Sequence, residues 1–297
     1  MSDTSDTKPT DDMHLNRMKT AESIFLPISR ETFEKLYLSP KHPSVQGDLR
    51  KKFGNPTPIC LMGFLIASTP HACMLMGWRG AGGNGSALVP AYIFFGGIVQ
   101  ILGGIGEWII GNTFSCAIFF TYGMAPHPQC TWRIMSGTGL DVYLTLGTFW
   151  LVQGGGLMPF FASGMNYSPT GNSFEGQQTE GYAATIGFYY LFLSLLTFIY
   201  LICSIRTNVC LFSALFLLVI TFALVAAAFF QMANGAHELA EKLLVAGGAF
   251  NFALCVPVWH IFLTQILEAV DFPISLPVGD LSSVIPGRSQ KMRRSED

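Results

Sequence analysis

Half of the 297 residues of this chain are hydrophobic and only 12% are charged. A single soluble core of this size could not bury so much apolar surface, so the composition predicts a protein of the lipid bilayer. The net charge of −2 excludes a basic nucleic-acid-binding protein, because Lys and Arg are neither in excess nor gathered on one periodic face.

Residues 1–52 form a polar tail, which we expect to be largely disordered and cytoplasmic. The part before Pro27 is rich in Ser, Thr, Asp and Lys and poor in large apolar residues. The segment SRETFEKLYL at 29–38 could form a short amphipathic helix on the membrane surface. No apolar signal-peptide core is visible in the tail, so the first membrane helix is expected to direct insertion.

The run NPTPICLMGF at 55–64 marks the change from this tail to membrane sequence. Its two prolines suit the first turn of a helix, with Asn55 as the N-cap. The N–H groups near Thr57, Ile59 and Cys60, at the positive end of the helix dipole, could bind an anion. The alternative is that the run only starts a membrane helix.

Six apolar segments of about 20 residues follow, each long enough to cross a hydrocarbon layer of about 30 Å as a helix. The third is irregular. The predicted spans are Pro58 to Trp78, Ala87 to Ile109, a third that begins near Thr113, Ala183 to Ser204, Val209 to Gln231 and Leu243 to Ala269.

Lys and Arg predict the orientation, because short loops rich in these residues stay cytoplasmic. Nine of the 17 lie before Pro56 and four lie in the last ten residues. Both termini are therefore expected in the cytoplasm, which requires an even number of spans. The glycosylation sequons at Asn84 and Asn166 fall on loops that this topology places outside.

Four polar residues lie close together around the end of the second span: Gln100, Glu107, Asn112 and Thr113. A carboxylate buried in lipid is costly, so Glu107 should find hydrogen-bond donors or take up a proton. A structural or transport role is therefore expected for these residues. The alternative is an interfacial Glu107 that pairs with water or lipid headgroups.

The cysteines, the histidines and the known catalytic and cofactor motifs predict neither an enzyme nor a metal or cofactor site. The seven cysteines lie within or beside apolar runs without a CxxC pair, which favours buried thiols. No Walker motif, HExxH or haem-binding CxxCH is present. His71 and His260 are expected to be neutral, hydrogen-bonded helix contacts rather than a proton relay.

Motifs spread over about residues 53–283 resemble the acetate uptake transporter family. This family includes the fungal ammonia/acetate-transport-out plasma-membrane proteins and the bacterial acetate/succinate permeases. The motifs are NPTPICLMGF at 55–64, Phe95-Gly96-Gly97 with Gln100 and Glu107, Gly111-Asn112-Thr113-Phe114, Tyr122-Gly123, Cys203-Ser204-Ile205-Arg206, Ala246-Gly247-Gly248 and LPVGDLS at 276–282.

The resemblance implies an all-α membrane protein whose protomer is a six-helix bundle with its own pore, usually assembled as a hexamer. It implies that Phe64, Tyr122 and Leu218 narrow the pore. The polar or anion-binding part of the path would then consist of Asn55, Thr57, Gln100, Glu107, Asn112 and Thr113.

The chain departs from the family pattern at four places. Thr57 stands where the family motif usually has its second small residue. Cys60 stands where a Gly is frequent, and a larger side chain there could shrink an anion pocket. His260 stands where a Tyr often follows Trp. Residues 124–148 stand where the family has one residue, so they interrupt the third helix as an atypical insertion. We interpret them as a possible unspliced intron, which a transcript containing all the extra codons would exclude.

The predicted function is a plasma-membrane transporter or channel for acetate and other short-chain carboxylates, coupled to protons. The transporter domain covers 53–272, and 273–297 form a cytoplasmic tail. Its partners would be small carboxylates, protons, the bilayer and further copies of the chain. The alternatives are an ammonium or ammonia exporter and a membrane sensor that transports nothing, with residues 1–52 as its effector.

Overall fold

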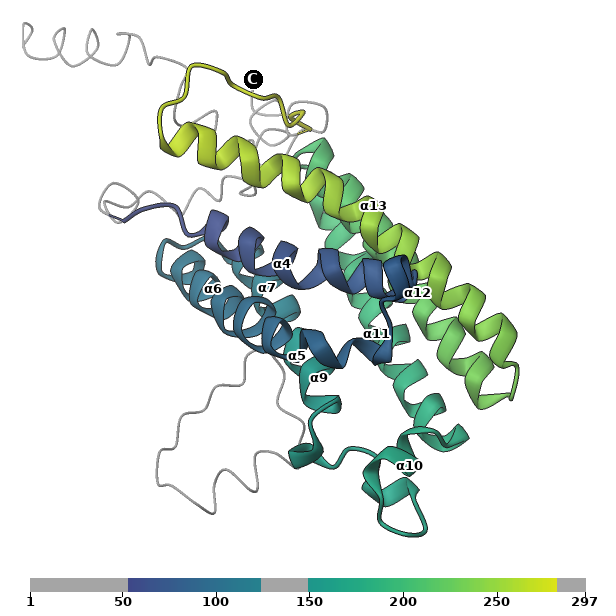
Figure 1. Ribbon diagram of the computed structural model, residues 1–297. Helices are drawn as coiled ribbons and strands as arrows, with labels where there is room; N and C mark the ends of the chain where they lie inside the picture. Colours follow the sequence, from purple (N-terminus) through teal and green to yellow (C-terminus); the bar gives the residue numbers. More distant parts are fainter. Residues whose placement is uncertain (1–52, 124–148, 282–297) are drawn as a thin grey trace, which may run out of the picture. The chain divides into compact units, whose positions relative to one another are not determined.

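The computed structural model describes residues 53–123 and 149–281, all within one compact unit, Lys35–Asp297. The described residues are helical and form no strand, apart from one isolated bridge between Asn208 and Asp280 (Figure 1). The predictions for the polar tail, the surface helix at 29–38 and the insertion at 124–148 fall outside the described residues.

Helix α4, Thr57–Leu75, is the first predicted span. Pro56 occupies the N-cap, and the side chain of Asn55 just before it accepts a hydrogen bond from the Thr57 N–H at 3.1 Å. The N-cap is therefore Pro56 and not the predicted Asn55, although the Asn55 side chain still accepts a hydrogen bond from the first turn. This shift of one residue is within the usual uncertainty of helix ends. Pro70 lies inside the helix, as membrane helices tolerate.

The second span is one continuous helical segment, Gly83–Ile109, with changing geometry. It begins as the 3₁₀ turns of η2, Gly83–Leu88, and passes through α5, Val89–Ala91. It then widens into a π-helix, η3, Tyr92–Val99, and ends as α6, Gln100–Ile109. Such wide turns are rare, and they are frequent at functional sites.

Glycines of this second span let neighbouring helices approach closely. A Cβ atom on Gly103 would lie 2.2 Å from Cys60 Sγ, and one on Gly96 would lie 2.5 Å from Trp150 Cγ. Small residues at helix contacts are the usual device for close packing in membranes. Cys60, the departure in the family motif, is therefore accommodated by the missing side chain of Gly103.

Two short helices stand where the third span was predicted. Helix α7, Thr113–Gly123, has 11 residues and α9, Phe149–Gly156, has 8. They pack against each other and against η3. Together their 19 residues match one span at about 1.5 Å per residue, but the residues that join them are outside the described part.

Three long helices complete the membrane part: α11, Glu180–Ser204, α12, Val209–Ala233, and α13, His237–Ala269. Helix α13 begins six residues before the predicted Leu243, because its polar first turns lie outside the apolar run. In the described residues, five helical segments are long and apolar enough to cross a bilayer; they lie at 57–75, 83–109, 180–204, 209–233 and 237–269.

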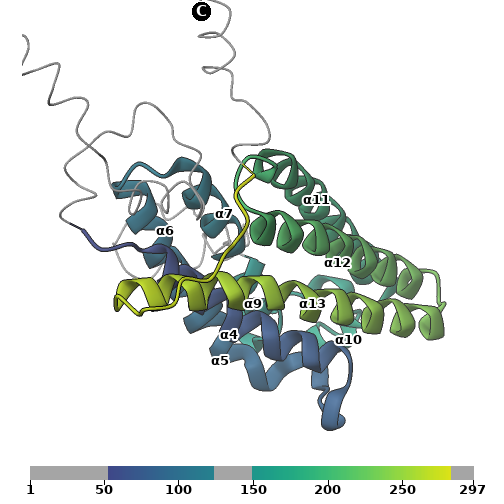
Figure 2. The same ribbon diagram turned by 90° about the horizontal axis from the view of Figure 1, so that it is seen from above.

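Helix α12 packs between α11 and α13, and α13 packs along α4, whose other side contacts η3 and α6 (Figures 1 and 2). Small elements follow α9: η4, Pro159–Phe161, η5, Met165–Tyr167, and α10, Ser173–Gln177.

The segment after α13 returns to the turn between α11 and α12. The N–H of Val209 donates to the carbonyl of Gly279 at 2.9 Å, and Val278 is buried. His260 Nε2 lies 3.0 Å from the Pro277 carbonyl oxygen. His260, which departs from the family motif, thus contacts the backbone of the non-helical segment after α13 rather than another helix.

The contact between α4 and α6 predicts a compensating pair of substitutions. Gly103→Ala should destabilise the protein by about 1–3 kcal/mol, because an added methyl overpacks against Cys60. Adding Cys60→Gly should restore much of this loss by removing the clashing sulfur. Thermal unfolding of the purified protein in detergent measures both effects, and equal melting temperatures for Gly103→Ala and the parent chain would contradict the packing.

Candidate functional site

A buried hydrogen-bonded cluster joins the start of α4 to the end of α6 and the start of α7. The Glu107 side chain is fully buried. Its carboxylate accepts hydrogen bonds from the Thr57 hydroxyl and, at 2.6 Å, from Asn112 Nδ2. Asn112 Nδ2 also donates to Ser115 Oγ at 2.9 Å. The buried carboxylate therefore has the donors that its burial requires.

The N–H groups that suggested an anion site all have acceptors in this structure. Those of Ile59 and Cys60 donate to the Pro56 carbonyl at 3.1 and 3.4 Å, and that of Thr57 donates to the preceding asparagine. The acidic side chain at this helix end is Glu107 itself, which accepts a hydrogen bond from the Thr57 hydroxyl. A negative charge is favourable at the positive end of a helix dipole.

Two other predicted polar residues do not join the cluster. Gln100 is 1% exposed and faces α4, where a Cβ on Gly63 would lie 3.2 Å from its Cγ. Its Oε1 atom is buried without a hydrogen-bond partner among the described residues. Thr113 is exposed at the first position of α7.

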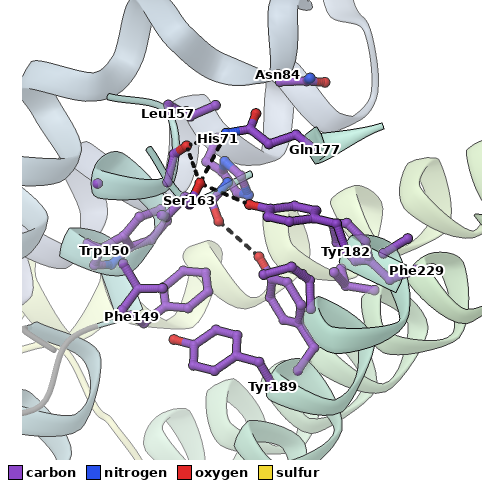
Figure 3. A pocket seen from close by; sticks show the side chains of 18 of the residues that line it. His71, Asn84, Phe149, Trp150, Leu157, Ser163, Gln177, Tyr182, Tyr189 and Phe229 are labelled. Atoms are coloured by element: carbon purple, nitrogen blue, oxygen red, sulfur yellow. Dashed lines mark hydrogen bonds between the residues drawn. The ribbon is translucent and has the colours of Figure 1, made fainter. Parts of the chain in front are cut away.

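The predicted constriction residues, in contrast, all line one cavity of about 1660 Å³. Its walls come from α4, the start of the second span, α7, α9, α11, α12 and α13, and from the segment between α9 and α11. Figure 3 shows part of them. Phe64, Tyr122 and Leu218 reach it from α4, α7 and α12. The predicted polar path residues are not among its lining residues, so the two predicted groups are separate in this structure.

The constriction residues are held by their neighbours. The Tyr122 hydroxyl is 2.9 Å from Thr197 Oγ1, and its ring stacks on Phe222 with centroids 6.4 Å apart. Leu218 lies one helical turn before Phe222 on α12 and is buried. Phe64 is half-buried on α4. Fixed aromatic and aliphatic side chains therefore form this part of the wall.

Five residues of α4 line the cavity, and four of them form a stripe along the helix: Phe64, Ser68, His71 and Leu75, with Met74 beside it. Their spacing of four, three and four residues places them on one face of a helix. Ser68 Oγ donates to Asn251 Oδ1 of α13 at 3.0 Å, and both side chains are buried. His71 is predicted from the sequence as a helix contact, and neither Ser68 nor Asn251 is predicted. The spacing of the stripe is the signal that points to Ser68.

A second polar network borders the cavity beyond α9 (Figure 3). Gln177 Nε2 donates to the Gly156 carbonyl at 2.9 Å and to Ser163 Oγ at 3.1 Å. Ser163 Oγ lies 3.4 Å from the Tyr182 hydroxyl on α11. These bonds tie the connecting segment to both of its flanking helices.

An exposed carboxylate organises the same connecting segment. Glu175 accepts hydrogen bonds from Thr170 and, at 2.7 Å, from Ser168. These two bonds hold the pKa of Glu175 below its usual range. A lowered folded-state pKa stabilises the segment above the unfolded pKa, and this contribution is lost as the pH falls through the folded pKa.

Removing the Glu107 carboxylate should destabilise the protein. In Glu107→Leu, Thr57 and Asn112 each lose a buried acceptor, at a cost of about 1–3 kcal/mol per unsatisfied group. Glu107→Gln keeps one acceptor oxygen and should cost less. Thermal unfolding in detergent measures the difference, with the exposed neighbour Thr113→Val as the control. A Glu107→Leu protein as stable as the parent would contradict the cluster.

A model of the GPR1/FUN34/yaaH family matches residues 38–125 and 130–283. Between residues 38 and 283, the two matched ranges leave out only residues 126–129, and the second one includes residues 130–148 of the predicted insertion.

Two relatives and one solved structure are similar to this chain. Protein alcS of Aspergillus fumigatus is 33% identical over 280 residues, which cover 94% of this chain and 93% of the relative. Acetate permease A of Emericella nidulans is 24% identical, over 95% of this chain and 82% of the relative. The bacterial acetate channel SatP matches with a TM-score of 0.53 and 21% identity, over 76% of this chain and 99% of that chain. This last likeness shows the fold alone.

Proposed function

The chain belongs to the GPR1/FUN34/yaaH family, and from this premise we propose that it is a multi-pass membrane protein that moves acetate and other short carboxylates. The observation that carries the proposal is the convergence of Phe64, Tyr122 and Leu218 on one cavity from three helices. Relatives named acetate permease and acetate channel support acetate as the substrate. The names of these relatives describe transport and not enzymatic catalysis.

We propose that the cavity opens to the outside of the plasma membrane and that both termini are cytoplasmic. Asn84 and Asn166, the two sequon residues, both line the cavity, and most Lys and Arg residues lie near the termini. In this topology α7 and α9 form the third of six spans, interrupted by 124–148. The protomers assemble as a homo-oligomer, a hexamer by family resemblance, with one path through each protomer.

In the proposed mechanism, a carboxylate enters the cavity, follows the α4 stripe and loses water at Phe64, Tyr122 and Leu218. Beyond the constriction lies the polar part of the path, formed by Asn55, Thr57, Gln100, Glu107, Asn112 and Thr113.

Proton coupling acts at Glu107. A protonated carboxyl cannot accept from Thr57 and Asn112 as a carboxylate does, so proton uptake loosens the cluster that joins α4 to α6 and α7. Acetic acid itself titrates much like a Glu side chain, at about 4 to 5. Acetate uptake should therefore rise as the external pH falls.

Uptake of labelled acetate by proteoliposomes tests the proposal, with protein-free liposomes as the control for passive permeation of acetic acid. The expected result is protein-dependent uptake that is faster when the outside is more acidic. Protein-dependent uptake without this acceleration would indicate an anion channel. No uptake beyond the control would contradict the proposed function.

Two further arms separate the alternatives. Inhibition by ammonium and not by propionate would favour the ammonium exporter. A variant lacking residues 124–148 should be assayed beside the full chain. In this variant α7 is joined directly to α9, so faster acetate uptake than in the full chain would show that residues 124–148 impair transport.

Phe64→Ala should change which substrates pass. Removing the ring widens the constriction, so uptake of a larger dicarboxylate such as succinate should rise several-fold while acetate uptake persists. Phe216→Ala is the matched control, because Phe216 is exposed on α12 and does not line the cavity. An unchanged substrate profile for Phe64→Ala would count against the constriction.

A further inference from the structure

The imidazole of His71 is fixed in the cavity wall by buried neighbours. His71 Nδ1 lies 2.8 Å from the Tyr92 hydroxyl. The ring packs edge-on against Tyr92 and Trp150, with centroids 5.6 and 5.5 Å away. Tyr92 and Trp150 are both fully buried, and they stack on each other. The ring is therefore held in one orientation in the wall of the cavity (Figure 3).

The other ring nitrogen, Nε2, is the one left for a ligand. Among the described residues, none forms a hydrogen bond with His71 Nε2. When the Tyr92 hydroxyl donates to Nδ1, Nε2 carries the proton and can donate to a carboxylate. When Nδ1 donates to Tyr92, Nε2 can accept the proton of a carboxylic acid. A neutral His71 thus suits both forms of a weak acid.

The position of His71 on α4 places such a ligand outside the constriction. His71 follows Phe64 by seven residues, about 10 Å along the helix axis. Ser68 lies between them on the same face, bonded to Asn251 of α13. The Asn251 amide donates one proton to the Ser68 carbonyl at 3.4 Å, and an amide has a second proton to offer.

We propose that His71 Nε2 and the Asn251 amide form a binding subsite for a small monocarboxylate, about 10 Å from Phe64 along α4. The inference rests on the proposed function and adds to it a binding site that the substrate occupies before it reaches the constriction. Two neutral hydrogen-bonding groups, not a fixed positive charge, recognise the carboxyl group there. Such a site can release its ligand toward the constriction, because the subsite holds it without an ion pair.

The test uses the double variant His71→Phe with Tyr92→Phe in full-length protein reconstituted into liposomes. Both replacements keep an aromatic ring, and removing both partners of a hydrogen bond leaves no buried polar group unpaired. The KM for acetate uptake should rise about tenfold, since a hydrogen bond to a charged group has about this effect. The maximal rate and the melting temperature should stay close to those of the parent.

Tyr92→Phe alone keeps Nε2 and should raise KM less than the double variant does. His260→Phe is the matched control, because His260 lies outside the cavity lining and bonds to a backbone carbonyl, and it should leave KM unchanged.

An unchanged KM in a folded double variant would overturn the subsite while leaving the proposed function intact. A parent protein that takes up no acetate would overturn the proposed function itself. If neither the double variant nor His71→Gln folds, His71 serves the fold rather than substrate binding, and the subsite is also overturned.

Discussion

The burial of one carboxylate constrains this structure more than any other single interaction. Glu107 lies away from solvent and is held by donors from α4 and from the start of α7. In hydrocarbon, a polar group must find its partners within the protein. Three helix ends are therefore tied together at one point, and α4 cannot shift relative to α6 without breaking these bonds.

The first turn of α4 and the part of α4 from Phe64 onward consequently have different surroundings. Its first turn is bonded to Glu107 and lies against the glycines of α6, so closely that Cys60 occupies the space opposite Gly103. From Phe64 onward, the same helix presents a stripe to a cavity of about 1660 Å³. One helix thus links a closed, hydrogen-bonded end to an open cavity, and Phe64, one of the predicted constriction residues, lies between the two.

Apolar length and turn chemistry predicted the five long membrane-capable helices. Contacts between residues far apart in the sequence could not be predicted in this way. The starts of α4 and α12 follow from Pro56 and from the cap Asn208. No spacing rule could pair Thr57 with Glu107, 50 positions away, or Ser68 with Asn251, 183 positions away. Those contacts depend on how the helices pack against one another. The residue pattern of a single helix does not predict this packing.

The constriction residues came from family resemblance, not from their local sequence, because a Phe, a Tyr and a Leu in apolar helices look like any other core residues. The polar cluster could be predicted in part: Glu107 and Asn112 are neighbours in sequence, and a buried carboxylate calls for donors. Its separation from the cavity could not be predicted, since it depends on how α4 packs against α6 and α13.

In the proposed mechanism, the cavity is the outer half of the path and ends at Phe64. Single cysteines at Leu75, Ser68 and Leu61, in protein without its own seven cysteines, test it with a water-soluble thiol reagent added from the cavity side. The account predicts reaction at positions 75 and 68, slowed by acetate, and none at position 61, which is buried beyond Phe64. Equal reaction at 61 and 68, or no reaction at 68, would contradict it.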